Sequence, residues 1–202
     1  MRIAALCLSL AAGILASGPP AEAGESTMKE PAADEKVVFD YGAGAEAWPN
    51  VDDPVMGGRS RSRMSLDGGV ATFEGVVSLE NNGGFASLRS RPEAHDLEGW
   101  DGLVLRLRGD GKTYGVRLRT EAAFDGVSYQ VKLATEAGRW IEARLPFAEF
   151  RPVFRGREVK GHPALDPGAI KTFGLIISDR QEGPFRLQID WIKAYRMRRP
   201  GN

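Results

Sequence analysis

Cysteine is nearly missing from this chain of 202 residues, since the only one, Cys7, stands inside the first apolar run. A disulfide needs two cysteines, and a zinc site built on cysteine needs several. Neither can therefore stabilise the rest of the chain, which must fold around an apolar core of its own.

Histidine is also scarce, and both copies, His95 and His162, stand close to prolines without a catalytic partner nearby. The motifs of serine hydrolases, zinc peptidases and P-loop nucleotide-binding proteins are absent. The adjacent carboxylates Asp52 and Asp53 would point to opposite sides of an extended chain, which is poor geometry for a two-carboxylate glycosidase. We therefore predict that the protein is not an enzyme and needs no cofactor.

An excess of positive charge is lacking too, because 27 lysines and arginines balance 27 aspartates and glutamates. Proteins that bind nucleic acid usually carry a net basic charge, so we expect no nucleic-acid partner. No apolar run reaches the roughly 20 residues of a membrane span, and we expect none in the mature chain.

The N-terminus has the features of an export signal. Arg2 precedes a short apolar stretch over residues 3–16, and Ala21-Glu22-Ala23 forms an A-x-A cleavage site. We predict a bacterial-type signal peptide over residues 1–23 and an exported protein, periplasmic or secreted. Residues 24–36 are small, charged and proline-containing, which is typical of a disordered spacer. A single domain is then expected over residues 37–196, followed by a tail over residues 197–202.

Helical periodicity is almost absent, whereas apolar and polar residues alternate along many short segments. Such alternation is typical of strands with one buried face. Turn residues such as Asp67-Gly68-Gly69 separate the segments and indicate hairpins. About nine or ten short strands at this spacing predict an all-β fold, an antiparallel β-sandwich of the jelly-roll type.

The clearest hairpin signal covers residues 103–119, with Gly109-Asp110-Gly111 as its turn. One side of this hairpin would be apolar, and the other would carry four arginines with Gln130 and Lys132 adjoining. Like charges on one strand face repel each other unless something opposes them. Two interpretations stay open: a solvated ladder with acidic neighbours, or a face that binds an anionic or polyol ligand. The arginines are Arg106, Arg108, Arg117 and Arg119.

Two glycine-rich loops, residues 52–60 and 81–85, are candidates for a binding surface. Pro54 restricts Asp53 to extended conformations, and Gly57-Gly58 permits backbone angles that are closed to other residues. We interpret the first loop as too polar and too flexible to be core. It is then either an elaborate connection or the place where the molecule meets a partner, and the sequence favours the second.

A structural calcium is a further alternative. Asp40 and Asp190 could meet if the terminal strands pair, and carboxylates are the ligands that calcium prefers. Solvated or ion-paired carboxylates are the competing explanation, and we predict no metal site.

Several segments occur in a characteristic order and spacing: the loop 52–60, the segments 73–75 and 79–87, Pro146-Phe147 with Phe150, the segment 174–185 and the ending 189–192. Together they resemble the complex I intermediate-associated protein 30 family over residues 37–195. The resemblance implies a galactose-binding-like jelly roll, related in fold to carbohydrate-binding modules. It also implies an assembly factor for NADH:ubiquinone oxidoreductase, which binds intermediates and catalyses nothing. The loops 52–60 and 81–85 and the turn 178–183 are the family's characteristic segments.

We therefore expect a non-catalytic exported binding module that acts by protein–protein contact in the assembly or scaffolding of a respiratory complex. A periplasmic carbohydrate-binding module is the alternative, so the partner is either a protein, such as a respiratory-complex subunit, or a glycan. The residues expected to bind are Asp52, Asp53, Met56, Gly57, Gly58, Ser60, Asn81, Asn82, Gly83, Gly84, Phe85, Arg106, Arg117, Arg119, Gln130, Asp179 and Arg180.

Overall fold

The structure is a computed structural model that describes residues 33–123 and 125–198. The predicted signal peptide and most of the predicted spacer lie outside these residues. The first strand, β1, spans Ala33–Asp40, so residues 33–36 belong to the folded domain and not to the spacer. At the other end Met197 belongs to the last strand and not to the tail, because it pairs with Ala33.

Twelve strands and four short 3₁₀ helices make up the described part of the chain. The strands are β1, β2 (Arg61–Asp67), β3 (Val70–Val77), β4 (Ala86–Arg89), β5 (Gly102–Arg108), β6 (Thr113–Arg119), β7 (Ser128–Ala134), β8 (Trp140–Pro146), β9 (Arg151–Phe154), β10 (Arg157–Glu158), β11 (Thr172–Ile177) and β12 (Gly183–Met197). The 3₁₀ helices are η1 (Asp53–Met56), η2 (Glu80–Asn82), η3 (Phe147–Glu149) and η4 (Pro167–Ala169).

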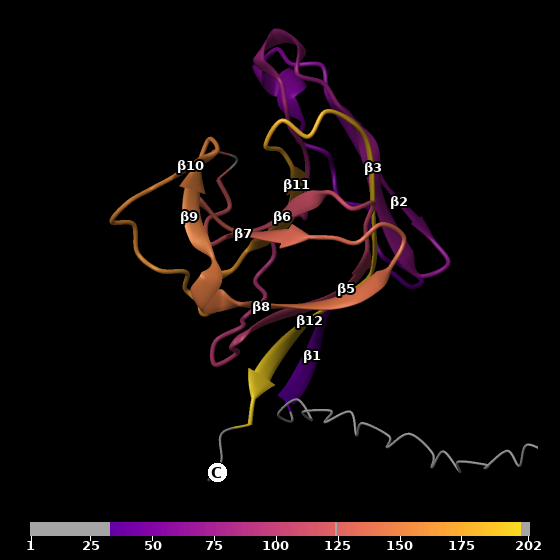
Figure 1. The fold of residues 1–202 in the computed structure, drawn as a ribbon. Helices are drawn as coiled ribbons and strands as arrows, with labels where there is room; N and C mark the ends of the chain where they lie inside the picture. The colour runs from indigo at the N-terminus through magenta and orange to yellow at the C-terminus, as the bar shows by residue number, and fades with distance from the viewer. Residues whose placement is uncertain (1–32, 124, 199–202) are drawn as a thin grey trace, which may run out of the picture. The chain divides into compact units, whose positions relative to one another are not determined.

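The strands form two sheets of six strands each (Figure 1). The first sheet has the order β2-β3-β12-β5-β8, and β1 pairs with the second half of β12. The second sheet has the order β10-β9-β7-β6-β11-β4. Every pair of neighbouring strands is antiparallel. The predicted antiparallel β-sandwich is therefore confirmed, and so is the hairpin of β2 and β3 around Gly68 and Gly69.

The apolar sides of the two sheets meet in one core. Leu105 in the first sheet and Val116 in the second are 0% and 2% exposed. Contact between the sheets is direct, because the ring centroid of Tyr114 on β6 lies 6.5 Å from that of Phe73 on β3. Alternation with a period of two buries one side of each strand and leaves the other for polar residues.

The predicted hairpin over residues 103–119 is wrong. β5 pairs with β12 and β8 in the first sheet, whereas β6 pairs with β11 and β7 in the second. The connection between β5 and β6 is therefore an arch from one sheet to the other. Asp110 stabilises this arch, because its carboxylate accepts hydrogen bonds from the Tyr114 hydroxyl and the Arg186 N–H, both at 2.9 Å.

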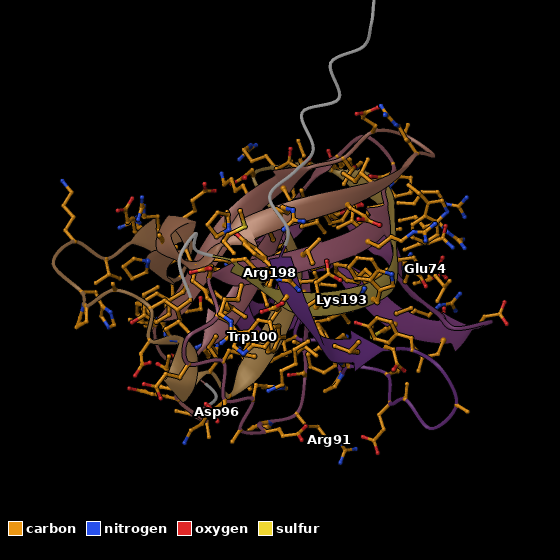
Figure 2. All side chains as sticks on the ribbon, turned by 90° about the horizontal axis from the view of Figure 1, so that it is seen from below. Glu74, Arg91, Asp96, Trp100, Lys193 and Arg198 are labelled. Carbon is orange, nitrogen blue, oxygen red and sulfur yellow. The ribbon has the colours of Figure 1, made fainter. Side chains whose placement is uncertain are left out.

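The terminal strands pair as expected, and other groups contact the two aspartates. Asp40 accepts a hydrogen bond from the Gly42 N–H, and Asp190 lies 3.5 Å from Arg106. No group of three acidic, histidine or cysteine residues with metal-binding geometry occurs within residues 33–123 and 125–198. Ion pairs add to the backbone pairing of β1 with β12, as Lys193 binds Glu35 at 2.8 Å and Arg198 binds Asp34 at 3.0 Å (Figure 2).

Candidate binding surface

The two glycine-rich loops lie together at one end of the sandwich, beyond the ends of β2 and β3 (Figure 1). The turn 178–183 runs beside them, because its flanking residues Ile177 and Gly183 pair with Ala86 and Val77 on either side of η2. We call the surface formed by residues 52–60, 78–85 and 178–183 the loop end. The structure thus brings together the three segments that the sequence singled out.

Asp53 holds the first two loops together from the inside. Its carboxylate is 1% exposed and accepts hydrogen bonds from the N–H and hydroxyl of Ser60, at 2.7 and 2.6 Å. It also accepts from the N–H groups of Gly84 and Phe85, at 2.7 and 3.2 Å. Four donors on one buried carboxylate make a strong charge-assisted network between loops that are far apart in the sequence.

This network sets the protonation state of Asp53. Burial alone would favour the neutral carboxyl group, but the hydrogen bonds from Ser60, Gly84 and Phe85 favour the carboxylate more strongly. The pKa of Asp53 is therefore below its ordinary value. The group is charged at neutral pH although it lies inside the protein.

Asp52 has the same kind of role towards the strands. Its carboxylate accepts hydrogen bonds from the N–H and hydroxyl of Ser62 on β2, both at 2.7 Å, and from the N–H of Ser87 on β4 at 2.9 Å. Because β2 and β4 belong to different sheets, Asp52 ties the edges of the two sheets together. We interpreted this segment as too polar for the core, and for Asp52 and Asp53 that interpretation is wrong. Both carboxylates are buried and accept several hydrogen bonds.

The predicted loop residues therefore divide into an internal and an external set. Asp52, Asp53 and Ser60 are buried, which excludes direct contact with a partner in this conformation. Position 83 requires glycine, because a Cβ atom there would lie 2.6 Å from an oxygen of the buried Asp53 carboxylate. The external set consists of Met56, Gly57, Asn81 and Asn82, and the half-buried remainder consists of Gly58, Gly83, Gly84 and Phe85.

Among the described residues, the most exposed large apolar side chains stand on η1. Val55 and Met56 are 64% and 67% exposed, and Arg59 beside them forms an ion pair of 2.8 Å with Glu80 of η2. Gly57 ends η1 in the left-handed conformation, at φ 89°. Val55 and the Arg59–Glu80 pair were not among the predicted site residues. The sequence signal for Val55 is an apolar dipeptide that follows proline in an otherwise polar loop.

In the turn 178–183, Asp179 and Arg180 are both exposed and both have positive φ, at 60° and 59°. The carboxylate of Asp179 lies 2.7 Å from Lys132 on β7. Gln181 fixes the turn to β6, because its side chain accepts from the Thr113 N–H at 2.9 Å and donates to the Thr113 carbonyl at 2.7 Å. The turn is thus a firm part of the loop end.

The four predicted arginines do not share a face. Arg106 and Arg108 lie on the outer side of the first sheet, where both guanidinium groups stack on Trp140, at 5.5 and 5.1 Å from the ring centroid. Arg108 also donates two hydrogen bonds to Gln188, at 2.9 and 2.6 Å. Their charges are thus engaged within the sheet.

Arg117 and Arg119 lie on the outer side of the second sheet. Arg117 donates to Gln130 on β7 at 2.7 Å, and Arg119 donates to the Gly126 carbonyl at 2.9 Å. The expected neighbourhood of Arg117 and Gln130 is confirmed, because the two residues are paired in register. The predicted ladder is therefore two separate pairs, one on each outer face of the sandwich.

The sequence of the described domain matches a known protein family. The model of the family "Complex I intermediate-associated protein 30 (CIA30)" matches residues 37–189, which is most of the described domain. The chain belongs to this family. The resemblance seen in the sequence is thereby confirmed.

Curated family members are similar at moderate identity. The chain is 29% identical over 181 residues to the mitochondrial complex I intermediate-associated protein 30 of Drosophila melanogaster and 30% identical over 173 residues to that of Mus musculus. These alignments cover 77% and 74% of this chain but 61% and 52% of the relatives. This family member thus spans little more than half the length of the curated relatives that it matches.

Two solved structures with a similar fold are a carbohydrate-binding module and part of an agarase. The family 11 module of the cellulase Lic26A-Cel5E from Clostridium thermocellum superposes with a TM-score of 0.60 at 16% identity, covering 81% of this chain and 95% of the module. The agarase AgWH50C superposes with a TM-score of 0.55 at 12% identity, over 79% of this chain and 24% of the agarase. At these identities the likeness shows the fold alone, and it agrees with the predicted antiparallel β-sandwich.

The relatives overturn the predicted location. The fly and mouse members of the family are mitochondrial, as is the member from Neurospora crassa, and a relative from Arabidopsis thaliana is chloroplastic. The prediction of a bacterial-type signal peptide and of a periplasmic or secreted protein conflicts with these findings and is wrong. Within the described residues, no helix has the length and apolarity that a membrane crossing requires.

Proposed function

We propose that this family member is a non-catalytic binding module that contacts a protein partner through the loop end during assembly of a respiratory complex. The names of the fly and mouse relatives describe association with complex I intermediates, which supports this class of role. The observation that carries the proposal is the exposure of Val55 and Met56, at 64% and 67%, on a turn whose base is fixed by Asp53.

Exposed apolar side chains contribute most to binding when their backbone is already ordered. Loops lose conformational entropy when they bind, and a loop that is rigid beforehand loses less. The hydrogen bonds of Asp53 to Ser60 and Gly84 order η1 in the free protein. The Arg59–Glu80 ion pair beside the apolar tip supplies the polar rim that surrounds a typical interface centre.

The test is capture of partners from solubilised membranes that contain complex I and its assembly intermediates. Immobilised wild-type protein is expected to enrich subunits of NADH:ubiquinone oxidoreductase, measured by mass spectrometry. A Val55→Ser/Met56→Ser variant is expected to capture about tenfold less, as loss of interface anchors usually costs this much or more.

The matched control is Val37→Ser on β1, which removes another apolar side chain, 53% exposed, outside the loop end. This control should capture as much as the wild type. Equal capture by the control and the double variant, or no enrichment of complex I subunits by the wild type, would refute the proposal.

The alternative is a carbohydrate-binding module, and it has the support of the fold alone. A sugar stacks on an aromatic ring, and Trp140 on the outer side of the first sheet is a candidate for that contact. Its ring is in contact with the guanidinium groups of Arg106 and Arg108, which compete with a sugar for that ring. A glycan array with selective signal for the wild type would favour this alternative over the protein partner.

A further inference from the structure

A small pocket opens on the outer side of the second sheet, where β4, β11 and β6 lie side by side. Its volume is about 20 Å³, enough for one water-sized group such as a single ligand oxygen. Its lining includes Ser87, whose N–H donates to Asp52 of the loop end. Gly174 makes room for it, because this residue pairs with Arg89 on one side and with Arg117 on the other. The polar lining consists of Ser87, Arg89, Arg117, Arg119 and Thr172.

Thr172 is the unusual residue of this pocket. Its side chain is 2% exposed, and its hydroxyl group forms no hydrogen bond with any part of the chain that the structure describes. Buried hydroxyl groups are nearly always hydrogen-bonded, because leaving one without a partner costs free energy. A ligand atom in the pocket would supply the missing partner.

The arginines determine which ligand chemistry suits the pocket. Arg119 is paired in register with Thr172. Arg117 stands two residues before Arg119, on the same side of β6. Arg117 uses its Nε atom for Gln130, and neither of its Nη atoms donates a hydrogen bond within the described residues. Burial and the charges of Arg119 and Arg89 lower the pKa of Arg117 to about 10. The positive charges of Arg117, Arg119 and Arg89 therefore lie close together in a partly desolvated pocket, and an anion bound there would be stabilised.

Two carboxylates, Asp125 and Asp179, act on these arginines from outside the pocket. Asp179 is ion-paired with Lys132 at 2.7 Å, and Asp125 is ion-paired with Arg155 at 3.0 Å. Neither aspartate lines the pocket. Asp125 still acts on Arg119, and Asp179 on Arg117, but each carboxylate shares its charge with a cation outside the pocket and offsets the charge of the arginines only in part.

We infer that this pocket takes up one oxygen of a phosphate-type oxyanion, which accepts from the Thr172 hydroxyl, while the other oxygens lie outside the pocket and face the guanidinium groups of Arg117 and Arg119. Arginine guanidinium groups match phosphate oxygens in geometry as well as in charge. The anion is either free phosphate or the phosphoryl group of a larger ligand. The inference is independent of the proposed function, because it involves none of the residues of η1 and η2.

The experiment is calorimetric titration of the purified protein at constant ionic strength with inorganic phosphate, phenyl phosphate, acetate and chloride. Saturable binding of inorganic phosphate or phenyl phosphate is expected. Thr172→Val keeps the shape of the side chain and removes the hydroxyl group, and Arg119→Gln removes one charge. Each variant should bind about tenfold more weakly, since a hydrogen bond to a charged group is lost.

The matched control is Arg106→Gln, which removes an arginine from the outer face of the first sheet and should bind as the wild type does. Thermal unfolding of each variant without anion establishes that it is folded. Equal binding of acetate, an equal effect of chloride, or unchanged binding in both Thr172→Val and Arg119→Gln would overturn the inference. Tighter binding of phenyl phosphate than of inorganic phosphate would support the phosphoryl group of a larger ligand, and the reverse would support the free ion.

Discussion

A Cβ atom on Gly58 would lie 2.4 Å from both Cγ and an oxygen of the Asp53 carboxylate. The absence of a side chain at position 58 is therefore what allows the carboxylate to sit beneath the loop and bind Ser60. The glycine and the aspartate form one structural unit. This unit gives η1 its fixed position and presents Val55 and Met56 to the solvent.

Gly58→Ala is expected to lower the free energy of unfolding by about 1–3 kcal/mol, because the new methyl group overlaps the carboxylate. Urea denaturation measures the change. Gly42→Ala is the control, since its Cβ would meet its nearest atom at an ordinary 3.5 Å. A loss of stability in Gly42→Ala as large as in Gly58→Ala would contradict the explanation.

Asp53→Asn is expected to cost about 3 kcal/mol, because the neutral amide replaces a carboxylate and brings an N–H₂ group towards buried donors. Chemical denaturation again gives the magnitude. The exposed Asp67 at the end of β2 provides the control Asp67→Asn, which should change stability by less than about 0.5 kcal/mol. Nearly equal stabilities of the two variants would show that the buried network is dispensable.

The stability of the wild type should depend on pH through Asp53. The pKa of Asp53 is lowered in the folded state, whereas the unfolded chain has the ordinary value of about 3.9. The contribution of this group is therefore fully present above the unfolded pKa and is lost as the pH falls through the lower, folded pKa. Denaturation curves from pH 6 downwards should show the stabilities of the wild type and Asp53→Asn converging in acid. A constant difference would contradict the assignment.

The Val55→Ser/Met56→Ser variant should unfold at the same denaturant concentration as the wild type, within about 0.5 kcal/mol. Both side chains are mostly in water, at 64% and 67% exposure, so the fold gains little from them. Thermal and chemical unfolding check this expectation. A large loss of stability would mean that the two residues support the loop, and reduced capture of partners could then not be assigned to a lost contact.

Much of the candidate surface followed from local sequence. The paired glycines, Pro54 and the two asparagines indicate loops, and the family resemblance indicates the same three segments. Burial of Asp52 and Asp53 could not be predicted, because their donors come from Ser62, Gly84 and Ser87, up to 35 residues away along the chain. An aspartate in a polar loop looks solvated until its distant donors are known.

The location of the arginines was likewise predicted in part by the sequence and decided in part by the tertiary structure. Alternation along residues 103–119 by itself determined that Leu105 and Val116 point inwards and that the arginines point outwards, because side chains alternate between the two sides of any strand. Only the tertiary structure decided that β5 and β6 pair with β12 and β11 and not with each other. A hairpin and an arch have the same alternation and the same reversal of direction. The choice between them depends on which distant strands pair with β5 and β6. The pairing of β6 with β11 is what placed Arg117 and Arg119 beside Thr172.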